Sequence, residues 1–467
     1  MLSAQQPEGL AHLPAYQSKM KAHGLKPVVI DTFSGYFKNI AASHAGLIHD
    51  RDIRPVTPDE IQDAAHLSAY GGKGEHLVKN TVMVILNGGL GTSMGLTRAK
   101  SLLIAKNNRS FLEVILKQAE TCGAKLSLMN SFMTHDDTRD ALCRINPPQF
   151  PKMFIQHKFP KILQDGLAPA DWPPNRDLEW NPPGHGDIYT AIYTSGVLQS
   201  LLDEGVVYAF ISNSDNLGAT LDKSLLGYFA EKNASFMMEV AARTPADIKG
   251  GHIARHQNGR FVLREAAQCP QNELNSFQDI HRYRFFNTNN IWINLKHLKA
   301  LFDRQGMIQL PMILNPKTLD PRDALSPPVF QVETAMGSAI GLFDRALAIK
   351  VDRSRFFPVK KCNELLAVQS DAFVLTEENK LILNPHRKYA QMEIDLDPFY
   401  YGIIDLFNER FKDGIPSLVD CESLKVVGDV FFEKNIRIQG RAVIENRRKS
   451  KAVIKEGTTV QGDLILD

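Results

Sequence analysis

Several features that define other classes of protein are missing from this sequence. The 467 residues contain no apolar run that approaches the roughly 20 residues needed to span a bilayer, so we expect no membrane-spanning helix. The first residues, MLSAQQPEGLAHL, lack a basic stretch followed by an apolar core, which argues against a secretory signal. A net charge of +2 offers no basic surface for nucleic acid or anionic membranes. We therefore expect neither nucleic acid nor membrane among the partners.

Cysteine is also scarce. The five cysteines are widely separated and odd in number, and no CxxC pair occurs. This pattern disfavours both a disulfide framework and a structural zinc site. A reducing compartment fits it best, so we predict a cytoplasmic protein.

The length of the chain predicts two or three domains. We expect residues 1–75 to form an N-terminal helical segment that packs on the core and ends in a glycine-rich linker at 71–74. Residues 76–384 are predicted to form the main domain, which we expect to carry the chemistry. Residues 385–467 are predicted to form a C-terminal domain.

The main domain has the pattern of an α/β fold. The continuous apolar runs 81–86 and 206–211 are typical of strands buried on both faces. They alternate with further strand patterns at 125–129 and 235–241, and with helix patterns that begin near residues 110, 134 and 222. This alternation predicts a Rossmann-like, mostly parallel sheet with helices on both faces. The loops that follow its strands should gather at one edge.

The C-terminal region repeats apolar residues at every sixth position. The two series are Val426, Phe432, Ile438 and Ile444, and Leu424, Val430, Ile436 and Ala442. A period of six fits neither a helix nor an ordinary strand, but it is typical of a parallel β-helix built from hexapeptides. We predict a left-handed parallel β-helix that offers a surface for homo-oligomers. The alternative is a chance alignment in a sheet rich in Ile and Val.

The run 81–86 ends in a glycine-rich loop, NGGLGTSMG. Such glycines can serve only a sharp turn, because they reach positive φ without steric cost. They can also let consecutive main-chain N–H groups bind an anion at the end of a strand. The loop matches neither GxGxxG nor the Gly-Lys-Ser/Thr of a P-loop. Lys100, shortly after it, would supply the point charge that a triphosphate needs.

This loop and seven further blocks resemble, in the same order, the eukaryotic-type UDP-glucose pyrophosphorylases (UTP–glucose-1-phosphate uridylyltransferases). The further blocks are FIQHKFPKI (154–162), WNPPGHGDIY (180–189), FISNSDNLGA (210–219), IKGGHI (248–253), NTNNIWINL (287–295), VETAMGSAI (332–340) and FFPVKKCNELL (356–366). The resemblance spans about residues 80 to 467. It implies that UTP and glucose 1-phosphate give UDP-glucose and pyrophosphate. The sugar phosphate itself attacks, so positioning and electrostatic stabilisation are the main catalytic effects.

The resemblance also implies which residues bind the nucleotide. The main chain would hold it at Leu86, Asn87, Gly88, Gly89, Gly91 and Thr92. Lys100 would contact the triphosphate and act in catalysis. Gln156 would read the edge of uracil, because an amide pairs with a pyrimidine imide, and Gly184 would let the base lie flat against the backbone.

A second set of residues would bind the sugar phosphate and the metal. His185 would contact the phosphate and Asn213 the glucose, and the candidates for the other sugar hydroxyls are Gly251, Asn289 and Glu333. Lys360 would be catalytic and hold glucose 1-phosphate and the transferred phosphate together. Asp215 would bind Mg²⁺, the one cofactor we expect. The plainer alternatives are a surface patch for Lys360 and a turn residue for Asp215.

Two other functions compete with this one. The same chemistry on an N-acetylhexosamine 1-phosphate is typical of a related family with an arginine in its glycine loop, where this chain has Ser93-Met94. A non-catalytic protein that binds a nucleotide sugar would not need Lys100, Asp215 and Lys360 together. Both features favour the glucose enzyme.

Overall fold

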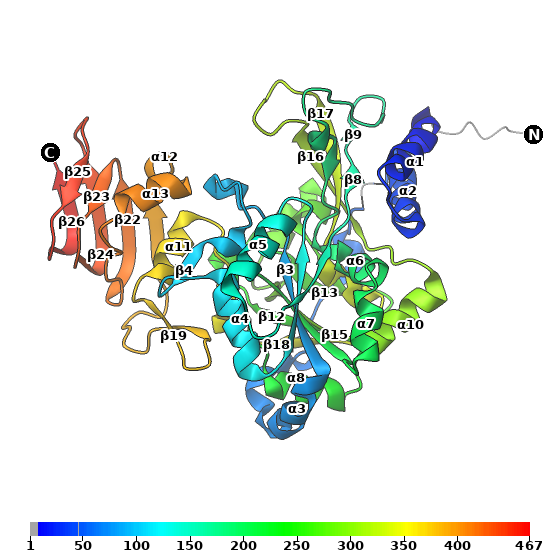
Figure 1. Cartoon of the computed structure of the whole chain (residues 1–467), viewed down its shortest axis with the longest axis horizontal. Helices are drawn as coiled ribbons and strands as arrows, with labels where there is room; N and C mark the ends of the chain where they lie inside the picture. Colours follow the sequence, from blue (N-terminus) through cyan, green and yellow to red (C-terminus); the bar gives the residue numbers. More distant parts are fainter. Residues whose placement is uncertain (1–7, 45) are drawn as a thin grey trace, which may run out of the picture.

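An 11-stranded mixed sheet lies at the centre of the molecule, in a computed structural model that describes residues 8–44 and 46–467 (Figure 1). Its main path runs through β2 (Gln62–Asp63), β18 (Ala346–Lys350), β12 (Phe236–Ala242), β15 (Phe285–Asn294), β11 (Tyr208–Asn213), β3 (Thr81–Asn87), β6 (Lys125–Asn130) and β7 (Lys152–Ile155). Neighbours on this path pair in parallel except around β15, which is antiparallel to both β11 and β12. The predicted α/β class is confirmed, with the sheet mixed.

The antiparallel strand β15 has a simple topological cause. The chain between β12 and β15 carries a hairpin of β13 (His252–His256) and β14 (Phe261–Arg264), followed by the short helix α9 (Leu274–Gln278). A parallel pair needs a crossover, usually through a long helix, and none is present in this connection. The chain therefore re-enters the sheet in the opposite direction.

Helices cover both faces of the sheet, as predicted (Figure 1). Alternate residues of β3 belong to two different cores: Val82 and Val84 to one, Met83 and Ile85 to the other. The first core includes α6 (Ile188–Thr194), α7 (Val197–Asp203) and α10 (Leu295–Gln305), and the second includes α4 (Phe111–Cys122), α8 (Lys223–Glu231) and α11 (Cys362–Gln369). A strand buried on both sides must be apolar at every position, which explains the continuous run.

The predicted elements of this domain are confirmed with small shifts. Helix α4 begins with the expected capping box: Ser110 Oγ accepts from Glu113 N at 3.2 Å, and the Glu113 carboxylate accepts from Ser110 N at 2.7 Å. Helix α5 (His135–Ile145) follows Thr134. Strand β11 starts at Tyr208 rather than Val206, because Val206 N donates to Leu201 O at 2.9 Å and so ends α7.

The predicted linker at 71–74 is wrong, since these residues form the helix α3 (Gly71–Leu77). A Cβ atom at Gly74 would overlap the carbonyl of Lys223, and one at Gly227 would overlap the carbonyl of Tyr70. The glycines therefore allow α3 to pack closely on α8. Close packing therefore accounts for Gly74, whereas nothing lies within 4 Å of a Cβ atom at Gly72.

The N-terminal helices α1 (Leu13–Ala22) and α2 (Pro27–Ala41) pack on one side of the main domain (Figure 1). Phe33 and Phe37 of α2 share a buried cluster with Phe159, Trp180 and Val332. The strands β1 (Ile53–Pro55) and β2 join the central sheet. The prediction of no secretory signal concerns residues 1–13, of which 1–7 lie outside the described part of the chain.

The C-terminal strands are all parallel. They form the sheet β21 (Glu393–Leu396), β22 (Cys421–Val427), β24 (Arg437–Asn446) and β26 (Thr459–Leu466), and the pair β23 (Val430–Phe432) and β25 (Ala452–Ile454). All eight residues of the two six-residue series are buried. Leu424 pairs with Ala442 and Val426 with Ile444, so stacked partners are three six-residue steps apart.

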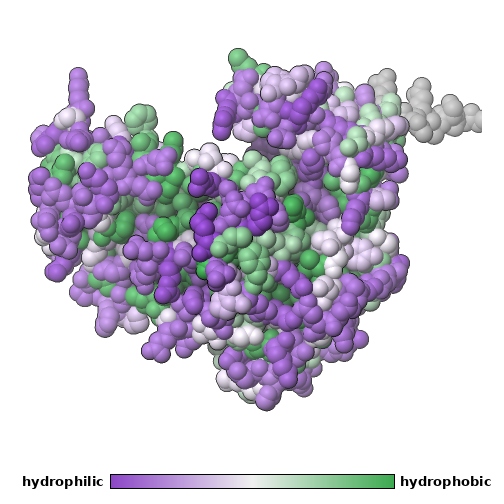
Figure 2. Space-filling view, in the orientation of Figure 1, coloured by the Kyte–Doolittle hydropathy of each residue, from purple (hydrophilic) through white to green (hydrophobic). Residues whose placement is uncertain are grey.

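The surface is mostly hydrophilic on the face shown in Figure 2, and its apolar side chains are scattered. A notch separates the C-terminal strands from a projection that contains β9 (Ile162–Leu163), β16 (Met312–Thr318) and β17 (Pro328–Thr334) (Figures 1 and 2). None of the described helices combines the length and apolar character that a bilayer crossing requires.

Candidate active site

The glycine loop leaves the sheet at the end of β3. Gly91 has a left-handed φ of 68°, and the chain then turns back so that Lys100 N donates to Gly89 O at 3.0 Å. A Cβ atom at Gly88 would lie 2.7 Å from Gln156 Nε2. The bare main chain therefore lies directly against the amide that we expect to read uracil. Thr92 opens a short 3₁₀ helix at the far side of the loop.

Lys100 and Asp215 meet beside this loop, and the main chain of Lys360 contacts it. Lys100 Nζ donates to Asp215 Oδ2 at 2.7 Å, and both side chains are largely buried. Val359 N donates to Asp215 O at 3.0 Å, and Ser93 Oγ donates to Lys360 O at 3.0 Å. Loops after β3, β11 and β18 thus converge at one edge of the sheet, where the rule for doubly wound folds places ligands.

Asp215 has a carboxylate oxygen that is free to bind a cation. Its Oδ1 atom is buried and has no hydrogen-bond partner among the described residues, whereas Oδ2 is bonded to Lys100. A buried carboxylate oxygen without a partner is costly unless something else binds it. The described chain holds no group of three or more His, Cys, Asp or Glu suited to a metal ion. Asp215 therefore fits Mg²⁺ whose other ligands are phosphate oxygens and water.

The turn at Gly184 and His185 is fixed to the projection. Gly184 has a φ of 77°, and a Cβ atom there would lie 2.6 Å from Thr334 O and close to the Glu333 side chain. His185 Nδ1 accepts from Met336 N at 3.0 Å. Burial lowers the pKa of His185 to about 4, so the ring is neutral at pH 7 and its proton lies on Nε2. His185 can therefore donate one hydrogen bond to a phosphate without adding a charge.

The other candidates for sugar contacts lie in three places. Asn213 pairs with Leu86 where β11 and β3 end side by side, so it lies at the glycine loop. Asn289 lies with a φ of 61° in a bulge of β15, where the pairing with β12 shifts register. Its Oδ1 accepts from Asn287 Nδ2 at 2.8 Å, and Asn287 N donates to Gly251 O at 3.0 Å. Gly251 and Asn289 are therefore neighbours, whereas Glu333 lies with Gly184.

Glu265 is a site residue that the sequence reasoning missed. It follows β14 directly, and a Cβ atom at Gly251 would overlap its carboxylate. Burial raises the pKa of Glu265 to about 7, against a smaller opposing effect of the Lys360 charge. A perturbed carboxyl group beside the proposed sugar contacts is typical of a functional site. The only signal in the sequence was its place at the end of a strand.

The raised pKa predicts a pH-dependent stability. Between about pH 4.5 and about pH 7 the folded protein retains a proton on Glu265 that the unfolded chain releases, so this group makes the folded state less stable as the pH rises. Glu265→Gln should abolish that loss. The melting temperature of the variant minus that of the natural protein should therefore increase as the pH rises from about 4.5 to about 7. The exposed Glu377→Gln is the control, and a difference that does not change with pH would contradict the assignment.

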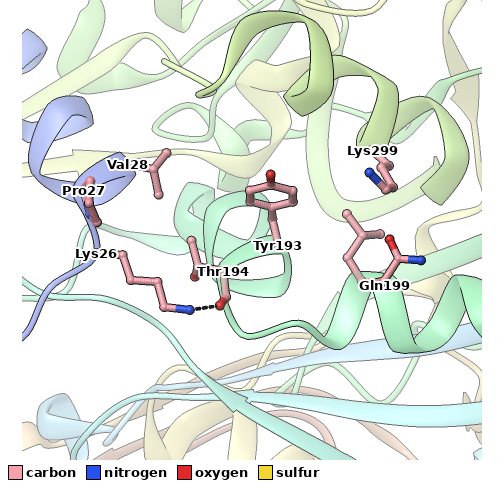
Figure 3. Close-up of a pocket in the computed structure, with 8 residues that line it drawn as sticks. Lys26, Pro27, Val28, Tyr193, Thr194, Gln199 and Lys299 are labelled. Atoms are coloured by element: carbon pink, nitrogen blue, oxygen red, sulfur yellow. Dashed lines mark hydrogen bonds between the residues drawn. The ribbon is translucent and has the colours of Figure 1, made fainter.

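A separate surface pocket of about 500 Å³ lies on the N-terminal side of the main domain (Figure 3). It is lined by Lys26, Pro27, Val28, Tyr193, Thr194, Leu198, Gln199 and Lys299. None of the predicted site residues lines it. Lys26 Nζ donates to the carbonyl of Thr194 at the C-terminal end of α6, as the dashed line in Figure 3 shows.

Comparison with known proteins agrees with this geometry. The family model for UTP–glucose-1-phosphate uridylyltransferase matches residues 30–439. The enzyme of that name from Solanum tuberosum is 38% identical over 457 residues, 95% of this chain and 94% of the relative. A UDP-glucose pyrophosphorylase mutant from Leishmania major, solved with UDP-glucose, is 39% identical with a TM-score of 0.89, and the match covers 98% of this chain and 99% of that one. UDP-glucose phosphorylase from Trypanosoma brucei is 42% identical with a TM-score of 0.87, over 98% and 100%.

The fold and the family of its relatives together define a nucleotidyltransferase of the α/β class, with a glycine-rich loop at the carboxyl end of a central strand. The family match covers most of the chain, and the relatives match over almost their whole length. The chain belongs to the UTP–glucose-1-phosphate uridylyltransferase family. It is an enzyme that forms UDP-glucose from UTP and glucose 1-phosphate.

Proposed function

We propose that the enzyme works by in-line attack of glucose 1-phosphate on the α-phosphorus of UTP, with Mg²⁺ and two lysines balancing the charge. The convergence of Lys100, Asp215 and Lys360 beside one glycine loop carries this proposal. In such a transfer the nucleophile is a phosphate oxygen that needs no activating base. The protein has to align two polyanions and neutralise the charge that develops between them.

Each proposed role follows from a position in the site. The main chain from Leu86 to Gly89, with Gly91 and Thr92, offers N–H groups to the nucleotide, and Gln156 lies over Gly88 to read uracil. His185 donates Nε2–H to the sugar phosphate. Lys100 neutralises the triphosphate. The glucose contacts are Asn213, Gly251, Asn289 and Glu333.

Lys360 and Asp215 complete the charge balance. The Lys360 ammonium bridges the incoming and the transferred phosphate, and its main chain is tied to the glycine loop through Ser93. Mg²⁺ would bind the free Oδ1 of Asp215 and supply positive charge to the phosphate oxygens. The existing bond from Lys100 to Oδ2 keeps that carboxylate oriented.

The test is pyrophosphate release from UTP, CTP, ATP and GTP, each with glucose, galactose and N-acetylglucosamine 1-phosphate, with and without Mg²⁺. We expect fast release only with UTP, glucose 1-phosphate and the metal. Greater activity on the N-acetylated sugar would support the related chemistry. An inert protein that still binds UDP-glucose would support a non-catalytic role.

We also propose the division into segments 1–75, 76–384 and 385–467, and a left-handed parallel β-helix in the last of them. The all-parallel C-terminal strands, and the stacking of partners in β22 and β24 three six-residue steps apart, support the β-helix. Its outer strand β26 offers an edge for homo-oligomers. The cytoplasmic location remains a prediction, and the five cysteines, all free, are compatible with it.

A further inference from the structure

We propose that a buried pair, His157 and Asp187, positions the uracil-reading segment and the sugar-phosphate-binding segment against each other. The inference depends on the proposed function of Gln156 and His185. Each member of the pair lies one or two residues from one of these, on a separate stretch of chain. Neither has been given a role in binding or catalysis above.

The contact between the two segments is dense. The Asp187 carboxylate accepts from His157 N at 2.6 Å and from His157 Nδ1 at 2.9 Å and 3.0 Å. The side chains of His157 and Asp187 are only 12% and 5% exposed, so water competes weakly for these bonds. Charge-assisted bonds of this kind are among the stronger ones in proteins. Asp187 therefore holds the main chain and the ring of His157 at once.

The ring of His157 is held on its other side as well. Its Nε2 atom lies 3.0 Å from Thr194 Oγ1, at the C-terminal end of α6. Asp187 precedes the first residue of the same helix. The ring therefore bonds side chains from both ends of α6, and the loop that carries it cannot shift along the helix without breaking a bond. Thr194 lies in the wall of the surface pocket of Figure 3.

Both segments are also hydrogen-bonded to other parts of the site. The pair therefore connects two segments that are each fixed elsewhere. Gln156 N donates to Asn130 O at 2.8 Å, at the end of β6 beside β3. On the other side, His185 is bonded to Met336 N and Pro183 O accepts from Thr334 N at 2.8 Å. The pair is a direct polar side-chain link between the nucleotide side and the projection side, in addition to the main-chain pairing of β8 (Phe159–Pro160) with β10 (Trp180–Asn181). A displacement of about 1 Å in such an arrangement can cost about 10²-fold in rate.

Five variants test the inference, one of them the double variant that combines Asp187→Asn with His157→Phe. Asp187→Asn removes the charge, and His157→Phe keeps a flat ring without nitrogens. His157→Asn places an amide N–H near the former Nδ1 and so can still donate to Asp187. Asp165→Asn, at an exposed position, is the control. The readouts are KM for UTP, KM for glucose 1-phosphate, kcat and the preference for UTP over CTP.

We expect Asp187→Asn and His157→Phe to lower kcat/KM about 10²-fold. In both variants the KM for both substrates should rise together, and the preference for UTP over CTP should fall. The double variant should be no worse than either single one, because the two residues act as a unit. His157→Asn should regain most of the activity, and the control should match the natural protein.

Several results would overturn the inference in a protein whose natural form is active. They are unchanged KM values and nucleotide preference in Asp187→Asn or His157→Phe, additive losses in the double variant, or equal losses in His157→Phe and His157→Asn. A loss of melting temperature with normal kinetics in the remaining folded protein would make the pair structural only. Inactivity of the natural protein would instead contradict the proposed function.

Discussion

Lys360→Met is expected to lower kcat by about 10³-fold while the protein stays folded. The methionine keeps the length and the apolar stem of the lysine and removes its charge. Lys360 is exposed, so little packing is lost, and the main-chain bonds of Val359 to Asp215 and of Ser93 to Lys360 do not involve its side chain. The loss should therefore fall on the chemical step. Steady-state kinetics and thermal melting of the same samples would measure both.

The adjacent Lys361 provides a matched control. It is equally exposed, and it precedes α11, where its main-chain N donates to the Glu364 carboxylate at 2.7 Å. Lys360, in contrast, is close enough to oppose the raised pKa of Glu265. Lys361→Met should therefore keep nearly full activity. If both variants lose activity equally, the effect is one of general basic charge, and if neither does, Lys360 is not catalytic.

The parts of the fold that could be predicted are those set by local patterns. Buried strands such as β3 need apolar side chains at every position, and the capping box at Ser110 is complete within four residues. The six-residue apolar series likewise predicts that Val426 and Ile444 are buried, as they are. In each case the residues that determine the structure lie within the segment itself.

The parts that could not be predicted depend on contacts between distant segments. Gly71 to Gly74 had the composition of a linker, and only the approach of α8 explains a helix there. Asp187 and His157 are 30 residues apart, and nothing in either segment alone indicates the bond between them. In the sequence Glu265 resembles any surface glutamate. Only the structure shows that Gly251 and Lys360 lie close to it.

The same distinction applies to the site. The glycine loop and Lys100 were predicted from their own residue pattern, whereas Lys360 was predicted only because of the resemblance. Their convergence depends on a network behind them, in which Asn216 Oδ1 accepts from Phe357 N at 2.8 Å and Asn216 Nδ2 donates to Arg355 O at 3.0 Å. Asn216 thus joins the loop of Asp215 to the segment that leads to Lys360. That segment is held in turn by a buried ion pair.

Removal of one partner of this ion pair is expected to destabilise the protein strongly. Arg355 donates to both oxygens of Glu239 at 2.7 Å, and the two side chains are 6% and 0% exposed. Arg355→Met would leave the Glu239 carboxylate buried without its counter-charge. Breaking such a pair typically costs about 3–5 kcal/mol. Thermal or denaturant unfolding should show a loss of this order, and activity in the folded fraction should also fall because Lys360 is displaced.

The double variant Arg355→Met with Glu239→Gln separates the charge from the shape of the site. Glutamine is uncharged, and its one amide oxygen can still accept from Trp292 Nε1, which now donates to Glu239 Oε1 at 2.8 Å. Much of the stability lost in Arg355→Met should therefore return, since no unpaired charge is buried. If the two changes instead add, the cost arises from lost packing around Arg355. In that case Arg355 stabilises the protein through packing. The explanation that the charges of the ion pair hold the segment before Lys360 is then wrong.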